Sequence, residues 1–228
     1  MIHLQKRLCA VLPALFCFGL LAFTLACGSS STKMRLVNAS PDESSLDLLV
    51  DSKTVASSVT YATASAYQGV SSGSRHLQVE PTGATTPVID ETVSISSGTT
   101  YTLMSTGFVN DVVPVLLTDD NSSPSSGDAK VRLVNAAPGL GSADVYLVAP
   151  GTDLSTTSPT VTALAVNAAS AYQSVAAGSY EVFFTLPGQK FVYIDSGSQT
   201  FSAGQIRTVL GLNSPTGGFT SAVLADAN

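Results

Sequence analysis

The sequence predicts an all-β protein made of two tandem antiparallel β-sandwich domains, and three observations support this fold class. First, the motif Arg-Leu-Val-Asn-Ala-Ser-Pro at residues 35–41 returns 97 positions later, at residues 132–138, as Arg-Leu-Val-Asn-Ala-Ala-Pro. Second, hydrophobic residues make up 44% of the 228 residues and charged residues only 11%, while 18 glycines and 11 prolines supply turns. Third, apolar and polar residues alternate in short runs. An internal repeat with this composition is typical of two turn-rich β domains.

The alternation indicates where the strands lie in each repeat. In the run Leu-Asp-Leu-Leu-Val-Asp at residues 46–51, every second side chain from the first is apolar, as expected of a strand with one buried face. About seven such strands, separated by short turns rich in Gly, Pro and Ser, fit one sandwich per repeat. We therefore expect separately folding domains at residues 34–120 and 129–228, joined by a polar, Ser-rich linker at residues 121–128.

The N-terminal residues carry the pattern of an export signal. Two basic residues precede an apolar run at residues 8–25, and Cys27 follows a small residue. This arrangement resembles a bacterial lipoprotein precursor, which implies cleavage after residue 26 and attachment of acyl chains such as palmitate to Cys27. Residues 1–26 are then the signal peptide, and residues 27–33 are the lipidated cysteine with its flexible tether. An ordinary signal peptide or an uncleaved anchor is the alternative.

Cysteine content and charge argue against several functions. Cys9, Cys17 and Cys27 all lie at or before the predicted cleavage point, so the mature chain is expected to have no disulfide and no free thiol for metal binding or catalysis. Removal of Lys6 and Arg7 changes the formal charge from −6 to −8. A chain this acidic is not expected to bind nucleic acid or to adhere electrostatically to anionic lipid headgroups.

The two repeats differ most at residues 150–159. Their register is 97 between Asp47 and Asp144 but 105 between Tyr67 and Tyr172, so eight residues (105 − 97) are inserted in the second repeat. Insertions are tolerated where the backbone is exposed to solvent. We expect this loop to carry any function that belongs to the second repeat alone.

Tyr67 and Tyr172 occupy equivalent places in the motif Tyr-x-x-Val-x-x-Gly. Either ring could stack on a sugar, but a packed ring with its hydroxyl bonded to nearby backbone is the favoured interpretation. The chain contains no tryptophan, which weakens the hypothesis of a sugar-binding platform.

Candidates for catalysis or metal binding are few. His76 is the only histidine after the predicted cleavage point and no Gly-x-Ser-x-Gly turn accompanies it, so we interpret it as a surface residue. Two acidic groups remain, namely Asp119-Asp120-Asn121 with Asp128, and the set Glu80, Asp90 and Glu91. The first lacks the spacing of an EF-hand and is interpreted as a solvated linker. The second would need a cleft between its carboxylates for glycoside hydrolysis. We predict no catalytic residue, no metal site and no cofactor.

Charged residues recur at matching places in otherwise apolar strands, as Arg35 and Asp47 in the first repeat and Arg132 and Asp144 in the second. A charge in such a strand is costly unless it is paired. We therefore predict the internal ion pairs Arg35–Asp47 and Arg132–Asp144, each joining the first two strands of a repeat. A ligand-anchoring arginine on the surface is the alternative.

Four motifs follow one another in a fixed order: Arg-Leu-Val-Asn-Ala-Ser-Pro, Leu-Asp-Leu-Leu-Val-Asp, Tyr-x-x-Val-x-x-Gly and Gly-Thr-Thr-Tyr-Thr-Leu. Together they resemble the bacterial family called domain of unknown function 4397. The resemblance implies exported β domains, often in tandem, without an assigned activity. Asn38 and Asn135 stand where that family commonly has His, so no role of an imidazole is expected there.

The sequence therefore predicts a non-enzymatic envelope lipoprotein whose two immunoglobulin-like or transthyretin-like sandwiches act as a binding or structural module. Its expected partners are the membrane, through the lipid anchor, and an unidentified protein or glycan. Its expected location is the outer membrane or the outer face of the cell membrane. The alternative is an accessory module or a hydrolase acting on envelope polysaccharide, which a pocket lined by carboxylates would favour.

Overall fold

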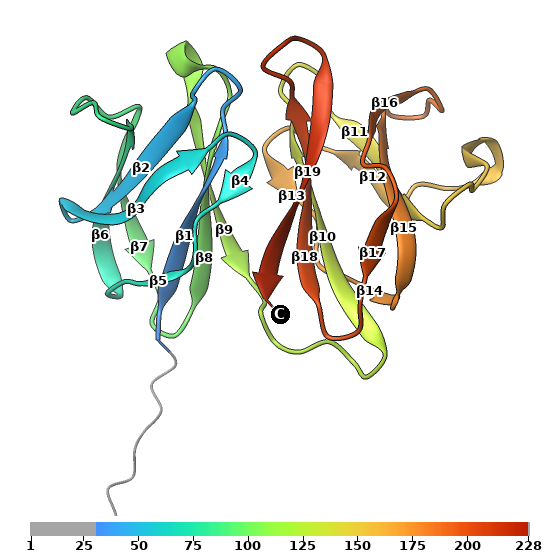
Figure 1. Cartoon of the computed structure of the whole chain (residues 1–228), viewed down its shortest axis with the longest axis horizontal. Coiled ribbons are helices and arrows are strands. Elements are labelled where there is room, and N and C mark those ends of the chain that lie inside the picture. The colour runs from blue at the N-terminus through green and yellow to red at the C-terminus, as the bar shows by residue number, and fades with distance from the viewer. Residues whose placement is uncertain (1–30, 228) are drawn as a thin grey trace, which may run out of the picture.

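The computed structural model describes residues 31–227, so the predicted signal peptide, Cys27 and most of the tether lie outside the described residues. The described chain contains strands β1 to β19 and two short helical turns, η1 (Val109–Asp111) and η2 (Leu154–Thr156) (Figure 1). The prediction of an all-β protein is confirmed. In residues 31–227, no helix has the length and apolar character needed to span a membrane.

The N-terminal half, residues 31–119, is built from two sheets. The first has the order β4 (Thr63–Ala64), β1 (Lys33–Ala39), β8 (Thr100–Thr106), β9 (Val113–Asp119), and β5 (Gln68–Gly69) also pairs with β1. The second has the order β3 (Lys53–Thr60), β2 (Ser45–Val50), β6 (Gly73–Pro81), β7 (Ile89–Ile95). Leu36, Leu48 and Leu77 belong to the buried core of this half. Every second residue of β2 is buried, as the alternation predicted.

The C-terminal half, residues 128–227, repeats this plan. One sheet has the order β13 (Ala168–Ala169), β10 (Asp128–Ala136), β18 (Ile206–Asn213), β19 (Phe219–Ala227), and β14 (Gln173–Ala176) also pairs with β10. The other has the order β12 (Val161–Leu164), β11 (Ala143–Val148), β15 (Gly178–Thr185), β16 (Val192–Asp195), and β17 (Gln199–Phe201) also pairs with β15. Leu133, Val145 and Phe184 lie in its core. Residues 120–127 link β9 to β10.

One pair of strands in each half runs parallel, which corrects the prediction of purely antiparallel sandwiches. β1 pairs with β8 along Lys33–Ala39, and β10 pairs with β18 along Lys130–Ala136. Parallel neighbours need a long crossover connection, and the strands of the second sheet supply it in each half. Because side chains alternate with a period of two in both arrangements, the sequence pattern could not distinguish them.

The two halves pack against each other through the sheets that contain β1 and β10 (Figure 1). One buried apolar cluster joins them, made of Val37, Ala39, Met104, Val134, Ala136, Leu210, Leu212 and Leu224. In β1, Leu36 faces the core of its own half and Val37 faces the other half. The repeated motif is therefore apolar on both faces because one face builds the sandwich and the other joins the halves.

Candidate functional site

Two buried arginines connect the halves. Arg35 on β1 is 1% exposed, and its Nη2 lies 2.5 Å from Oδ1 of Asp226 on β19. Arg132 on β10 is 2% exposed, and its Nη2 lies 2.8 Å from Oδ1 of Asp119 at the end of β9. The second contact has the distance of an ion pair without the alignment of a hydrogen bond. Each arginine therefore pairs with a carboxylate of the other half.

The predicted pairs Arg35–Asp47 and Arg132–Asp144 are wrong in their partners. β1 and β2 belong to different sheets, as do β10 and β11, so the charged side chains of successive strands do not meet. The arginines face the other half of the chain. The premise that a buried arginine needs a carboxylate partner is nevertheless correct.

Asp47 and Asp144 have a different and shared role. Oδ1 of Asp47 accepts a hydrogen bond from the backbone N–H of Ser58 at 2.7 Å, and Oδ1 of Asp144 accepts one from the N–H of Ala163 at 2.7 Å. Ser58 and Ala163 have φ angles of 53° and 47°, at irregularities where β3 and β12 pair with their neighbours. Each aspartate thus fixes a bulge in the edge strand beside it.

Two hydroxyl groups donate to one oxygen of the Asp119 carboxylate. The hydroxyls of Thr102 and Tyr67 donate to its Oδ2 at 2.7 Å and 2.8 Å. Nε of Arg35 donates to Oγ1 of Thr102 at 2.8 Å, and its guanidinium carbon lies 4.6 Å from the centre of the Tyr67 ring. Burial raises the pKa of the Tyr67 hydroxyl above its usual value, so this group also keeps its proton and donates at alkaline pH.

The group around Asp226 has the same composition. Its Oδ2 accepts hydrogen bonds from the hydroxyls of Thr208 and Tyr172, both at 2.7 Å. Nε of Arg132 donates to Thr208 at 3.1 Å, and the Arg132 guanidinium carbon lies 4.8 Å from the centre of the Tyr172 ring. Burial raises the pKa of Tyr172 as well. We call these eight residues the reciprocal network: Arg35, Tyr67, Thr102 and Asp119 of one half, and Arg132, Tyr172, Thr208 and Asp226 of the other.

The reciprocal network also tests the interpretation of the two repeated tyrosines. Tyr67 and Tyr172 are packed rings, as favoured over sugar-stacking rings, but their hydroxyls bond to carboxylates rather than to backbone. The arginines, threonines and tyrosines of the network bond to its two carboxylates or to one another. Its groups are engaged with each other, so the arrangement is suited to holding the halves together.

His76 and the carboxylates considered for hydrolysis lie on β6 and β7. Nε2 of His76 lies 2.5 Å from Oδ1 of Asp90, and this hydrogen bond lowers the pKa of Asp90 below its usual value. Both side chains are exposed, which agrees with the interpretation of His76 as a surface residue. Glu80, Asp90 and Glu91 line none of the three cavities of residues 31–227 that are described below.

Of the acidic residues considered for Ca²⁺, Asp119 and Asp120 take part in ion pairs, and Asp128 accepts a hydrogen bond from Ser174. Asp119 belongs to β9 and to the reciprocal network rather than to the linker. Asp120 lies 2.7 Å from Nζ of Lys130, and this hydrogen bond lowers the pKa of Asp120 to about 2. Within residues 31–227, no cluster of three or more His, Cys, Asp or Glu side chains could hold a metal ion.

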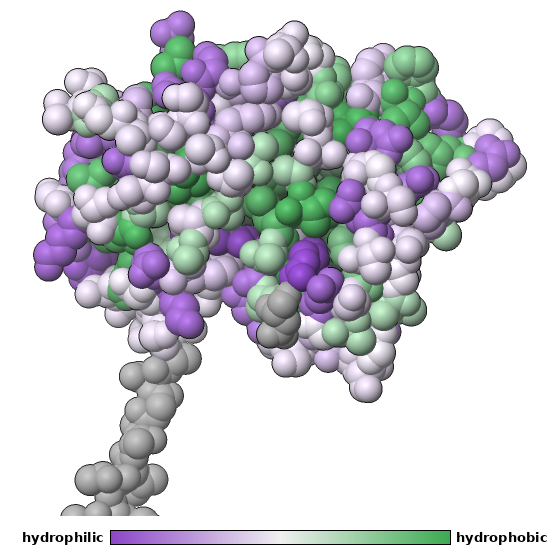
Figure 2. All heavy atoms as spheres, in the orientation of Figure 1, coloured by the Kyte–Doolittle hydropathy of each residue, from purple (hydrophilic) through white to green (hydrophobic). Residues whose placement is uncertain are grey.

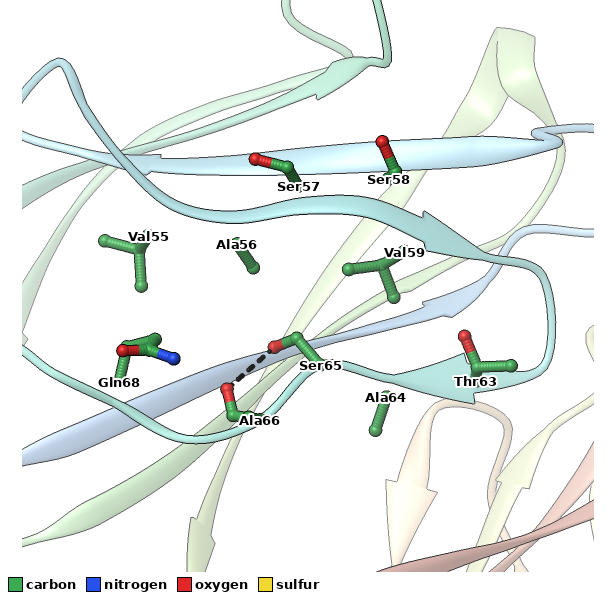
Figure 3. A pocket seen from close by; sticks show the side chains of 10 residues that line it. All are labelled: Val55, Ala56, Ser57, Ser58, Val59, Thr63, Ala64, Ser65, Ala66 and Gln68. Carbon is green, nitrogen blue, oxygen red and sulfur yellow. Dashed lines mark hydrogen bonds between the residues drawn. The ribbon is translucent and has the colours of Figure 1, made fainter.

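Three open cavities lie on the described surface. The first, of about 340 Å³, separates β3 from residues 63–68, and Figure 3 shows Ala56 and Val59 facing these residues across it. The second, of about 310 Å³, continues along β3 toward residues 69–71. The third, of about 430 Å³, lies between the halves beside Asp226. The lining of the first cavity includes no charged side chain, so this groove has no group for acid–base catalysis.

Phe191, Tyr193 and Phe219 form an exposed cluster on the C-terminal half, which we call the aromatic surface. Phe191 is 68% exposed and Tyr193 is 37% exposed. The ring centres of Phe191 and Tyr193 are 5.0 Å apart and those of Tyr193 and Phe219 are 6.2 Å apart, each pair edge to face. β16 and the start of β19 lie at the upper end of Figure 1, opposite the start of β1, and Figure 2 shows hydrophobic side chains gathered at that end.

The local sequence explains this exposure. Gly188, with a φ of 73°, allows the turn that ends the preceding hairpin strand. Alternation then places Phe191 and Tyr193 on the outer side of the strand, whereas Ile194 is buried in the core. Sequence reasoning missed this surface because it looked for tryptophan, although the spacing Phe-Val-Tyr after a glycine turn was a usable signal.

The insertion predicted at residues 150–159 lies next to the aromatic surface. Lys190, which precedes Phe191, donates a hydrogen bond from Nζ to the carbonyl of Thr157 in this segment. The same Nζ donates to the hydroxyl of Tyr146 at 3.0 Å and lies 4.9 Å from the centre of its ring. Tyr146 is consequently only 1% exposed. Lys190 therefore joins the insertion to the hairpin that carries the aromatic surface.

Comparison with known proteins gives one family and several distant folds. The model of the family described as Domain of unknown function (DUF4397) matches residues 32–146, from the start of the N-terminal half into β11. No curated protein matched the chain.

Three solved structures have low similarity to the chain. A module of family CBM26 from Eubacterium rectale Amy13K, solved with maltoheptaose, is 12% identical, with 86% of this chain and 98% of that chain covered and a TM-score of 0.29. A structure titled as α-glucan binding by a streptococcal virulence factor is 8% identical, covers 78% and 92%, and has a TM-score of 0.26. A family 41 carbohydrate-binding module from streptococcal virulence factors is 10% identical, covers 84% and 97%, and has a TM-score of 0.27. TM-scores this low support no conclusion about the ligand of this chain.

Proposed function

Because the chain belongs to the DUF4397 family, whose description states no activity, we propose a function from the geometry. The protein is a non-enzymatic binding module of the bacterial cell envelope that holds a glycan on the aromatic surface. Its two halves are tandem domains of this family, and together they form one body that carries that surface. The observation that supports this proposal is the exposure of Phe191 and Tyr193 beside Phe219.

The size of the aromatic surface favours a glycan over a protein partner. A Phe or Tyr side chain has about 150–250 Å² to bury, so exposures of 68% and 37%, with a smaller part of Phe219, leave on the order of 250 Å². A stable protein–protein interface buries about 800 Å² on each partner. The exposed rings therefore match the footprint of one or two sugar units better than that of a protein.

The position of the aromatic surface fits a protein held at its N-terminus. Under this proposal, Cys27 carries the lipid anchor in the outer membrane or on the outer face of the cell membrane, and residues 27–33 are the tether. The start of β1 lies at the end of the molecule opposite β16 (Figure 1). An anchored chain would thus present the aromatic surface away from the bilayer, toward extended envelope glycans.

The hydrolase alternative has less structural support. Glycoside hydrolysis needs two carboxylates across a cleft. The carboxylate of Asp90 is bonded to His76 and Gln78 on an exposed sheet face, and the Asp226 carboxylate beside the third cavity is held by Arg35 and Tyr172. These groups are engaged in structural contacts rather than arranged across a groove.

Retention of the soluble chain, with residues 1–27 removed, on immobilised polysaccharides tests the proposal. The panel contains peptidoglycan sacculi, α-glucan and β-glucan. We expect the wild type to be retained by at least one of them, and Phe191→Ala to weaken this binding about 3- to 10-fold, because an aromatic contact contributes about 0.5–1.5 kcal/mol.

Phe108→Ala is the matched control, because Phe108 is an exposed phenylalanine (47%) of the N-terminal half. This variant should bind like the wild type. Retention on none of the polysaccharides, or an equal loss in both variants, would rule out the aromatic surface as the binding site.

A further inference from the structure

The contacts across the interface between the halves are reciprocal. Arg35 of the N-terminal half meets Asp226 of the C-terminal half, and Arg132 of the C-terminal half meets Asp119 of the N-terminal half. Each half therefore contributes one buried cation and one buried anion. The apolar contacts follow the same rule, because β1 and β10 contribute the equivalent residues Val37 and Val134 to one cluster.

This reciprocity makes the interface resemble that of a two-fold symmetric dimer. In such an interface the same patch is used on both sides and is complementary to itself. A face that carries Arg35 with Asp119 has the charges needed to meet Arg132 with Asp226, whichever molecule supplies them. Specific recognition thus lies in the two faces and not in the segment that connects them.

The covalent connection between the faces is short and polar. Residues 120–127 join β9 to β10, and Lys130 holds the first part of this linker through Asp120 and Ser122. Both contacts lie outside the reciprocal network. Within one chain, a linker of this length keeps the second face at an effective concentration of about millimolar, so the chain closes on itself at lower concentrations.

We propose that the interface between the halves is also a pairing surface for a second copy of this chain. When the linker is too short for the two halves of one chain to pack together, the N-terminal half of each chain packs against the C-terminal half of another. The same buried network then forms between molecules. The product is a closed dimer with two copies of the interface. Exchange of identical elements between protomers needs no new contact, because every contact already exists in the closed monomer.

Deletion of residues 120–127 in the soluble chain tests this proposal. Asp128 lies four residues before Arg132 on β10, so it is roughly 13 Å along the strand from the residue that meets Asp119. Direct fusion of Asp119 to Asp128 leaves about 3.8 Å between their Cα atoms, which is too short for closure within one chain. We expect light scattering to give twice the mass of one chain, with a circular dichroism spectrum like that of the wild type.

Two variants complete the experiment. Replacement of residues 120–127 by eight Gly and Ser residues should leave a monomer, because closure remains possible. Arg35→Asp in the deletion chain places two carboxylates against each other and should reduce dimerisation at least 10-fold. A folded monomer from the deletion chain, open-ended aggregates, or a dimer that Arg35→Asp does not weaken would overturn the proposal.

Discussion

Arg132 lies between the carboxylates of Asp119 and Asp226, with its Nη2 at 2.8 Å from the first and 3.8 Å from the second. Desolvation of a charge is expensive, and a buried ion pair is only weak evidence of net stability. Removal of one partner is different, because the remaining charge stays buried without compensation. Removal of Arg132 should therefore lower the stability of the fold by more than the intact ion pair contributes to it.

We predict that Arg132→Leu lowers the free energy of unfolding by about 3–5 kcal/mol, because the buried Asp119 loses its cation, whereas Asp226 keeps Arg35. Urea melts followed by circular dichroism measure this change. Arg75→Leu is the matched control, since Arg75 pairs with Asp51 at 2.8 Å but the two side chains are 27% and 43% exposed. It should cost about 0–1 kcal/mol. Equal losses in the two variants would show that Arg132 is not in a desolvated network.

Tyr61 links the halves by a further contact, in which its hydroxyl donates to the backbone carbonyl of Asn213. Burial raises the pKa of Tyr61 to about 12, from an ordinary value of 10. The folded state therefore keeps the proton after the unfolded chain has lost it. This contribution to stability is fully present below pH 10 and is lost as the pH rises toward 12.

We predict that the wild type loses more stability between pH 10 and pH 12 than Tyr61→Phe does, because the variant has no hydroxyl to ionise at that position. Denaturant melts at several pH values measure the difference. The ultraviolet absorbance of tyrosinate should also show one group fewer titrating near pH 12 in Tyr61→Phe. Identical pH profiles for the two proteins would contradict the burial of the Tyr61 hydroxyl between the halves.

At the scale of single residues, the sequence predicted that Arg35 and Arg132 are buried and paired, because both lie in apolar strands. It could not identify the partners. Asp226 is 191 residues from Arg35 along the chain, and nothing local indicates a contact at that separation. The nearer Asp47 and Asp144 were the plausible choice, and the assignment of β1 and β2 to different sheets made it wrong.

At the scale of elements, alternation located strands but not all their boundaries. β2 and β3 form a hairpin whose two turn residues, Asp51 and Ser52, have φ angles of 51° and 63°. Two-residue hairpins usually signal themselves by Asn-Gly or Asp-Gly. The absence of glycine here hid the start of β3 at Lys53. The parallel pairing of β1 with β8 was equally hidden, because it depends on the path of the whole second sheet.

The insertion at residues 150–159 is an element whose position depends on one side chain. Lys190→Met removes the hydrogen bonds from Nζ to Thr157 and Tyr146 while retaining an unbranched apolar stem. We predict that limited proteolysis then cleaves within residues 150–159 several-fold faster than in the wild type, because local opening becomes more frequent. Lys53→Met, a change at an exposed lysine of the N-terminal half, should leave the rate unchanged. Slow cleavage in both variants would show that the insertion is held by other contacts.

At the scale of the whole molecule, the repeat and the polar linker predicted two separately folding domains. The strands do divide at residues 120–127, and each half has its own core. The third apolar cluster and the reciprocal network change the energetic expectation, because separation would expose the apolar side chains of that cluster and would break the ion pairs of Arg35 and Arg132. The sequence predicted the repeat but not the interface. A strand that is apolar on both faces must be covered on both, but its sequence does not identify the segment that covers the second face.

The central inference is that the two halves form one cooperative unit, which fixes the aromatic surface relative to the start of β1. Differential scanning calorimetry of the soluble chain tests it by comparing the calorimetric enthalpy of unfolding with the van't Hoff enthalpy. A single transition with a ratio of about 1 is the predicted result, because neither half can separate without exposing the apolar cluster that joins them. Two transitions, or one transition with a ratio of about 2, would contradict it and show that the halves unfold independently.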